Sequence, residues 1–93
     1  MDIVIYTNPE VLEHKKSREF PLYYWKYWKF SRMPKHIELH KDRIYFAVKG
    51  FVVGSFEIAD IIGNEIEWSP TSWKELNKPI PCKPFRGFRY KWW

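Results

Sequence analysis

Cysteine, glycine and glutamine are scarce in this chain, and each shortage is informative. Cys82 is the sole cysteine, so no internal disulfide can form and no cluster of thiolates can hold a metal. The four glycines are not clustered, which excludes a glycine-rich loop that cradles phosphates. Glutamine is absent whereas lysine, glutamate and arginine are plentiful, a composition typical of hyperthermophile proteins.

Long hydrophobic runs are also missing. Charged residues such as Lys26, Lys49 and Glu57 interrupt the most apolar stretches, so the sequence predicts no membrane-spanning helix. The first ten residues lack the basic region and cleavage signal of a secretory leader, and we therefore expect a cytoplasmic protein. A chain of 93 residues has room for one core, so we expect a single domain over residues 1–93.

Aromatic residues, in contrast, are abundant, with seven Phe, six Trp and six Tyr. They concentrate in two blocks, seven rings in residues 20–30 and five in residues 85–93, and lysine or arginine interrupts both blocks. Ring faces beside cationic side chains are what a protein needs to stack bases and neutralise phosphates. The same rings can also build the core of a small domain, so the sequence leaves both uses open.

The net charge of +5 is unevenly distributed along the chain. Residues 14–35 and 78–93 are strongly basic and contain a single acid, Glu19. Residues 1–13 and 36–77 are net acidic. Such segregation produces a directional field that favours an anionic partner on one side, the alternative being a solvated and thermally adapted surface.

Local patterns predict two short elements near the N-terminus. Residues 2–6 alternate as a strand, and Thr7 or Asn8 can cap a short helix that begins at Pro9. Residues 22–32 show no clear period, and we expect an irregular or helical segment there.

From residue 35 onward the chain alternates in the manner of strands. The expected features are strands at 36–40, 43–48, 51–62, 65–68 and 88–92, a two-residue turn at Lys49-Gly50, a helical turn after Ser69, and an extended edge segment through Pro79, Pro81 and Pro84. Five to six short strands with one or two short helices predict a mainly β (α+β) domain, folded as a small antiparallel barrel.

The stretch Arg43–Ala59, RIYFAVKGFVVGSFEIA, resembles the central hairpin of the PUA-like superfamily. It is most similar to the ASCH and EVE branch, in which an aromatic-rich strand like FRGFRY at residues 85–90 closes the barrel. The resemblance covers Arg43–Tyr90, about half of the chain. It implies a PUA-like pseudo-barrel with a basic cleft beside it that binds RNA or a modified nucleobase.

One ASCH subgroup hydrolyses acylated cytidine with a lysine, a nearby threonine and a glutamate on the central hairpin. The matching positions here are Lys16, Ser17 and Glu57, although serine replaces threonine and the glycine of the family's motif is missing. The resemblance therefore implies an alternative function as a small amidohydrolase acting on a modified nucleoside.

The residues and the resemblance together predict an RNA-binding module in which both aromatic blocks face one cleft. In the last strand, residues 89 and 91 are expected to point outward while rings at 88, 90 and 92 face the core. The predicted nucleic-acid-binding residues are Tyr24, Trp25, Lys26, Trp28, Lys29, Arg32, Arg86, Arg89 and Lys91.

Two further features bear on a protein partner and on a metal or cofactor. Aromatic residues such as Trp92 and Trp93 indicate a protein-interaction or dimerisation surface as a third interpretation. His36 and His40 have no third ligand at metal spacing, so we expect neither a metal nor a cofactor.

Overall fold

The computed structural model describes residues 1–17 and 26–93, which form one helix and seven strands. The elements are β1 (Ile3–Tyr6), α1 (Pro9–Lys16), β2 (Tyr27–Lys29), β3 (Arg43–Val48), β4 (Phe51–Ile62), β5 (Glu65–Trp68), β6 (Lys74–Pro81) and β7 (Phe88–Tyr90). The predicted mainly β fold class is confirmed. The predicted helix is also confirmed, with the Asn8 side chain accepting a hydrogen bond from the Val11 N–H.

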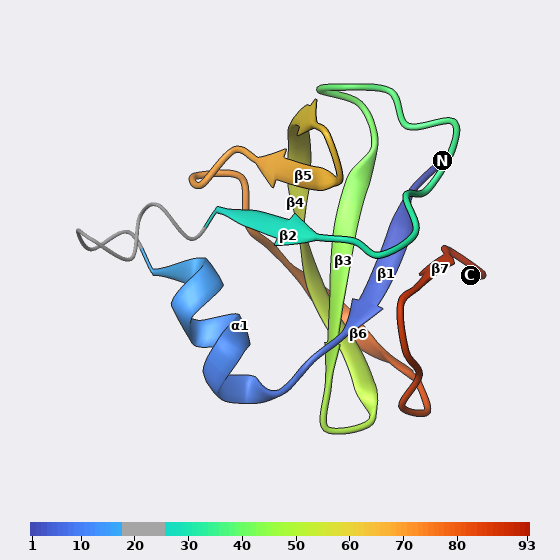
Figure 1. Ribbon diagram of the computed structural model, residues 1–93. Coiled ribbons are helices and arrows are strands. Elements are labelled where there is room, and N and C mark those ends of the chain that lie inside the picture. The colour runs from blue at the N-terminus through green and yellow to red at the C-terminus, as the bar shows by residue number, and fades with distance from the viewer. Residues whose placement is uncertain (18–25) are drawn as a thin grey trace.

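The strands form one curled sheet in the order β2-β5-β4-β3-β1-β7, with β6 paired to β4 away from this path. Figure 1 shows the long β3–β4 hairpin in the middle of a half-barrel, with β2 crossing in front of it. The sheet is mixed rather than antiparallel throughout, because β1 pairs with β3 in parallel. Parallel pairing needs a long crossover, and the segment containing α1 and β2 provides it.

The β3–β4 hairpin turns tightly, as the sequence predicts. Lys49 and Gly50 both have positive φ, 49° and 87°, which matches the right-handed twist of the flanking strands. The Tyr6 hydroxyl accepts a hydrogen bond of 2.6 Å from the Gly50 N–H and so ties the turn to β1.

Side chains alternate between two packed faces of the sheet. The main core contains Ile3, Ile5, Phe46, Phe56 and Trp68 among others, and the rings of Phe56 and Trp68 stack with centres 5.0 Å apart. The opposite face contains Val4, Tyr45, Ala47, Val52 and Cys82. This face is also apolar, so both sides of the central strands are covered.

Gly54 is required where β4 passes under the loop that leads into β6. A Cβ at this position would collide with the Trp73 ring and with the Lys74 carbonyl oxygen. The absence of a side chain lets Trp73 approach Phe56, with ring centres 4.9 Å apart. Trp73 is half-buried and packs against the main core through this approach.

Two local predictions are wrong, and polar contacts explain both. Residues 36–40 form no strand, because His36 and His40 adopt positive φ and the Asp42 carboxylate accepts a hydrogen bond from the Glu38 N–H. The helical turn predicted after Ser69 is also absent, and the chain forms a non-helical turn there. Its Ser72 hydroxyl accepts from the Glu57 N–H of β4 instead of capping a helix.

The segment 22–32, expected to be irregular or helical, contains strand β2 at Tyr27–Lys29. Pairing with β5, in which Trp28 lies opposite Ile66, imposes the extended conformation. Residues 22–25 of that prediction lie outside the described residues. The segment 79–84 is expected at an edge, and its first part belongs to β6, which among the described strands pairs with β4 alone.

Candidate functional site

A groove of about 870 Å³ lies between the two ends of the curled sheet. The strands β2 and β7 are the terminal strands of the sheet, and no ladder joins them, so the groove follows the open seam of the half-barrel. Its lining residues are Tyr6, Trp28, Lys29, Phe30, Ser31, Arg32, Phe85, Arg86, Gly87, Phe88, Arg89 and Tyr90. Most of them belong to or directly follow the two aromatic blocks of the sequence, whereas Tyr6 belongs to β1.

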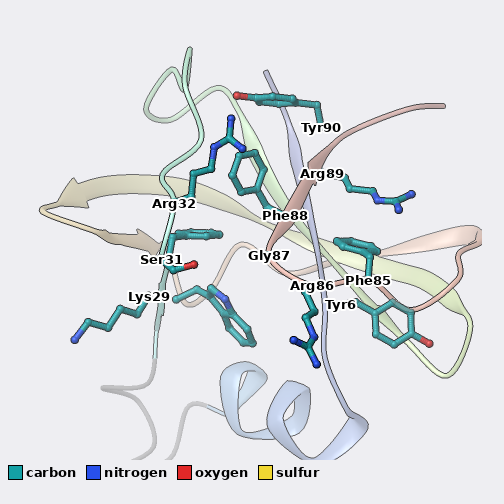
Figure 2. A pocket seen from close by; sticks show the side chains of 12 residues that line it. Tyr6, Lys29, Ser31, Arg32, Phe85, Arg86, Gly87, Phe88, Arg89 and Tyr90 are labelled. Atoms are coloured by element: carbon teal, nitrogen blue, oxygen red, sulfur yellow. The ribbon is translucent and has the colours of Figure 1, made fainter.

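One wall is formed by residues 29–32, which continue from β2, and the other by residues 85–90, which lead into β7 (Figure 2). The first wall is fixed by a 2.8 Å hydrogen bond from the Phe30 N–H to the Asn64 carbonyl. The second wall turns at Gly87, whose φ of 74° a residue with a side chain rarely adopts. Both walls are therefore set by the backbone.

Six aromatic residues contribute rings to the groove. Phe30 and Phe88 meet edge to face across the seam with centres 6.0 Å apart, and Phe88 contacts Tyr90 at 5.4 Å. Tyr6 and Phe85 form a second perpendicular pair at 6.0 Å. Phe30 is buried and the other five are half-buried, so the groove presents partly accessible rings above a packed floor.

Four exposed cations line the groove and no acidic residue does: Lys29, Arg32, Arg86 and Arg89. Within residues 1–17 and 26–93, no carboxylate forms an ion pair with any of these four. Arg89 lies over the Phe85 ring, 4.8 Å from its centre. Without local counter-charges, these side chains give the groove a positive potential.

The tyrosine hydroxyls of the groove are already engaged by the protein. The Tyr90 hydroxyl accepts a 2.9 Å hydrogen bond from the Lys35 N–H and so fastens one end of the seam. The Tyr6 hydroxyl is held by Gly50. Ser31 is the remaining hydroxyl in the lining, and it is exposed.

The structure brings together five of the nine predicted nucleic-acid-binding residues: Trp28, Lys29, Arg32, Arg86 and Arg89. Trp28 is shared with the core, because it meets Phe46 edge to face at 5.9 Å. Tyr24 and Trp25 lie outside the described residues. Lys26 does not line the groove, and its carbonyl accepts a hydrogen bond from the Trp68 N–H.

The strand predicted over residues 88–92 ends at Tyr90, and Trp92 is exposed rather than turned toward the core. Lys91 lies directly after β7. Its ammonium is 5.3 Å from the ring centres of both Tyr45 and Trp93, and 3.9 Å from the Asp2 carboxylate. Trp92 and Trp93 are partly exposed beside it, and the idea that they form a dimer interface stays a prediction.

The residues predicted for the amidohydrolase alternative contact different partners and not one another in the described ion pairs. Lys16 pairs with Glu75 at 3.3 Å and with Glu13 at 3.7 Å, whereas the Glu57 carboxylate faces His40 Nδ1 at 3.7 Å. Ser17 is the C-cap residue of α1 and follows Lys16 directly. The described ion pairs therefore do not join Lys16 to Glu57.

Lys15 is buried, and its environment is aromatic. Its ammonium donates a 2.8 Å hydrogen bond to the Tyr27 carbonyl and lies 4.9, 5.6 and 5.9 Å from the ring centres of Tyr27, Trp28 and Trp68. Burial lowers the pKa of Lys15 below its usual value, because a charge is costly away from water. This contact links α1 to β2, directly behind the Trp28 side of the groove.

Residues 1–17 and 26–93 contain no group of three or more His, Cys, Asp or Glu side chains placed to hold a metal. Burial raises the pKa of the Cys82 thiol, and Arg89 acts weakly in the opposite direction. The one helix that the structure describes is too short to cross a membrane.

Seven groove residues were not among the predicted binding residues: Tyr6, Phe30, Ser31, Phe85, Gly87, Phe88 and Tyr90. The rings of the second block were assigned to the core, because strand alternation places Phe88 and Tyr90 on the inner face. Phe88 and Tyr90 do pack against the main core, but they also line the groove, because the inner face of the sheet opens into the seam. Nothing in the local sequence indicates Tyr6, which reaches the groove through the β1–β7 pairing.

The fold and groove together define a small β half-barrel with a basic, aromatic seam. Comparisons of the chain with models of protein families, with curated proteins and with solved structures found no match. The resemblance to the PUA-like superfamily, and its ASCH and EVE branch, therefore stays a prediction.

Proposed function

We propose that this protein binds RNA in the groove along the seam. The observation that carries the proposal is the composition of the groove, which combines four exposed cations, six aromatic residues and no acid. An anionic polymer with flat, stackable bases matches both features. The PUA-like resemblance points to the same class of ligand.

The cations are placed to hold phosphates rather than protein carboxylates. Arg32 and Arg86 belong to opposite walls, and Figure 2 shows Arg86 toward α1 and Arg32 toward Tyr90. A phosphate backbone that follows the groove can therefore meet a cation at each end. Arginine suits this contact because its planar guanidinium offers paired donors.

The proposal is tested by titrating the protein with a single-stranded oligoribonucleotide at several salt concentrations. We expect quenching of tryptophan fluorescence through Trp28, and an affinity that falls steeply with salt. Arg86→Gln should reduce the slope of log affinity against log salt by about 0.7, the value for one lost phosphate contact on a single strand. Lys78→Gln, which changes an exposed lysine outside the groove, is the matched control.

Two outcomes would contradict the proposal. One is the absence of binding at low salt, where even non-specific association is strong. The other is an equal change of slope in Arg86→Gln and Lys78→Gln, because the phosphates would then be held by the general charge of the protein and not by the groove.

A further inference from the structure

We infer that the groove holds an unpaired strand by its phosphates and base faces, and that it does not select base identity. This inference rests on the proposed function and specifies the form of nucleic acid that the site accepts. It follows from which polar groups the groove offers and which of them the protein already uses.

Reading a base edge requires hydrogen-bonding groups that are free to face it. None of the lining residues is Asn, Gln, Asp, Glu or His, the side chains that pair with adenine and cytosine edges or adapt to several bases. The hydroxyls of Tyr6 and Tyr90 are bonded to the backbone of Gly50 and Lys35. Ser31 contributes one hydroxyl, which is too little to distinguish four bases.

The groove is rich in ring faces, which contact every base in the same way. Phe85, Phe88 and Tyr90 are half-buried, so their rings are partly accessible within the groove. Bases can reach recessed rings only when they are unstacked and unpaired, because a duplex hides the base faces inside its own stack. The site should therefore prefer a single strand to a duplex of the same composition.

Arginine and lysine are lining residue types that can select a base, since both can donate to the O6 and N7 atoms of guanine. Guanine is therefore the most demanding comparison. The experiment measures the affinity of the protein for equal-length labelled strands of oligo-U, oligo-C and oligo-A, for an oligo-U with one central guanine, and for a duplex.

We expect the four single strands to bind within about fivefold of one another, and the duplex to bind at least about tenfold more weakly. Phe85→Leu keeps an apolar side chain but removes a stacking face, and it should weaken single-strand binding about fivefold or more. Phe51→Leu is the matched control, because Phe51 is exposed on the β3–β4 hairpin away from the groove. Thermal unfolding of both variants shows whether the fold is kept.

A strand that binds about tenfold or more tightly than the others would show that a base edge is read, and would overturn the inference while leaving RNA binding in place. Duplex binding as tight as single-strand binding would overturn it too. If no oligonucleotide binds, both this inference and the proposed function are wrong.

Discussion

At the scale of single residues, aromatic rings serve the core and the surface at once. Trp28 lines the groove on one side and packs against Phe46 on the other. Behind it, Lys15 is buried with its ammonium over three rings. The cation–π contacts and the hydrogen bond to Tyr27 offset part of the cost of burying this charge.

The lowered pKa of Lys15 predicts how the free energy of unfolding depends on pH. Below the folded-state pKa the amine is charged in both states, and the cost of burying it is fully present. Between that pKa and the higher value in the unfolded chain, the folded state loses the proton first, so this cost falls as pH rises. The wild type should therefore gain stability relative to Lys15→Met in the alkaline range.

Urea unfolding of both proteins, from about pH 7 to about pH 10, measures this difference. The comparison with Lys15→Met removes the contribution of tyrosines and other groups that titrate in the same range. A stability difference that stays constant with pH would contradict the account of Lys15.

At the scale of elements, one side chain fastens the loop before β6 to the central hairpin. Arg43 Nε donates to the Ser55 hydroxyl at 2.7 Å, and its NH2 group donates to the carbonyls of Ser55 and Ser72 at 3.0 and 2.7 Å. Because Ser72 also accepts from Glu57, the loop is held to both β3 and β4.

Arg43→Lys should lower the free energy of unfolding by about 1.5–3 kcal/mol, because a lysine ammonium cannot reproduce the planar guanidinium group that makes these three hydrogen bonds. Chemical denaturation measures the loss. Arg86→Lys is the control: Arg86 is exposed and has no described hydrogen bond, so its cost should stay below about 0.5 kcal/mol. Equal stability of the two variants would show that the Arg43 bonds contribute little.

Elements defined by local chemistry were predicted correctly from the sequence. The Lys49-Gly50 turn and the Asn8 cap follow from φ preferences and side-chain acceptors that act over a few residues. In contrast, β2 is extended because β5 lies beside it, and residues 36–40 are bent by polar contacts around Asp42. Strand β5 is far from β2 along the chain, and the bend at 36–40 is also held by the N-terminal ammonium, which donates to the His36 carbonyl and to Asp42. Local sequence patterns therefore do not predict either feature.

At the scale of the whole molecule, the curl of the sheet creates the candidate site. The sequence indicates two basic aromatic blocks, and each block contributes one wall of the groove. Their meeting depends on a strand order that brings β2 and β7 to opposite ends of one curled sheet. Local sequence patterns do not determine the order of the strands. They therefore indicate the cations of the two blocks, but not Tyr6, which joins the groove through the β1–β7 pairing.

The central claim is that both walls of the seam bind one ligand together, and backbone NMR of the full chain tests it most directly. On titration with a single-stranded oligoribonucleotide, amide shifts should change in residues 29–32 and in residues 85–90 at the same ligand concentration. The exposed part of β6 around Asn77 and Lys78, which does not line the groove, should change least. Changes confined to one wall, or strongest outside the groove, would contradict the account.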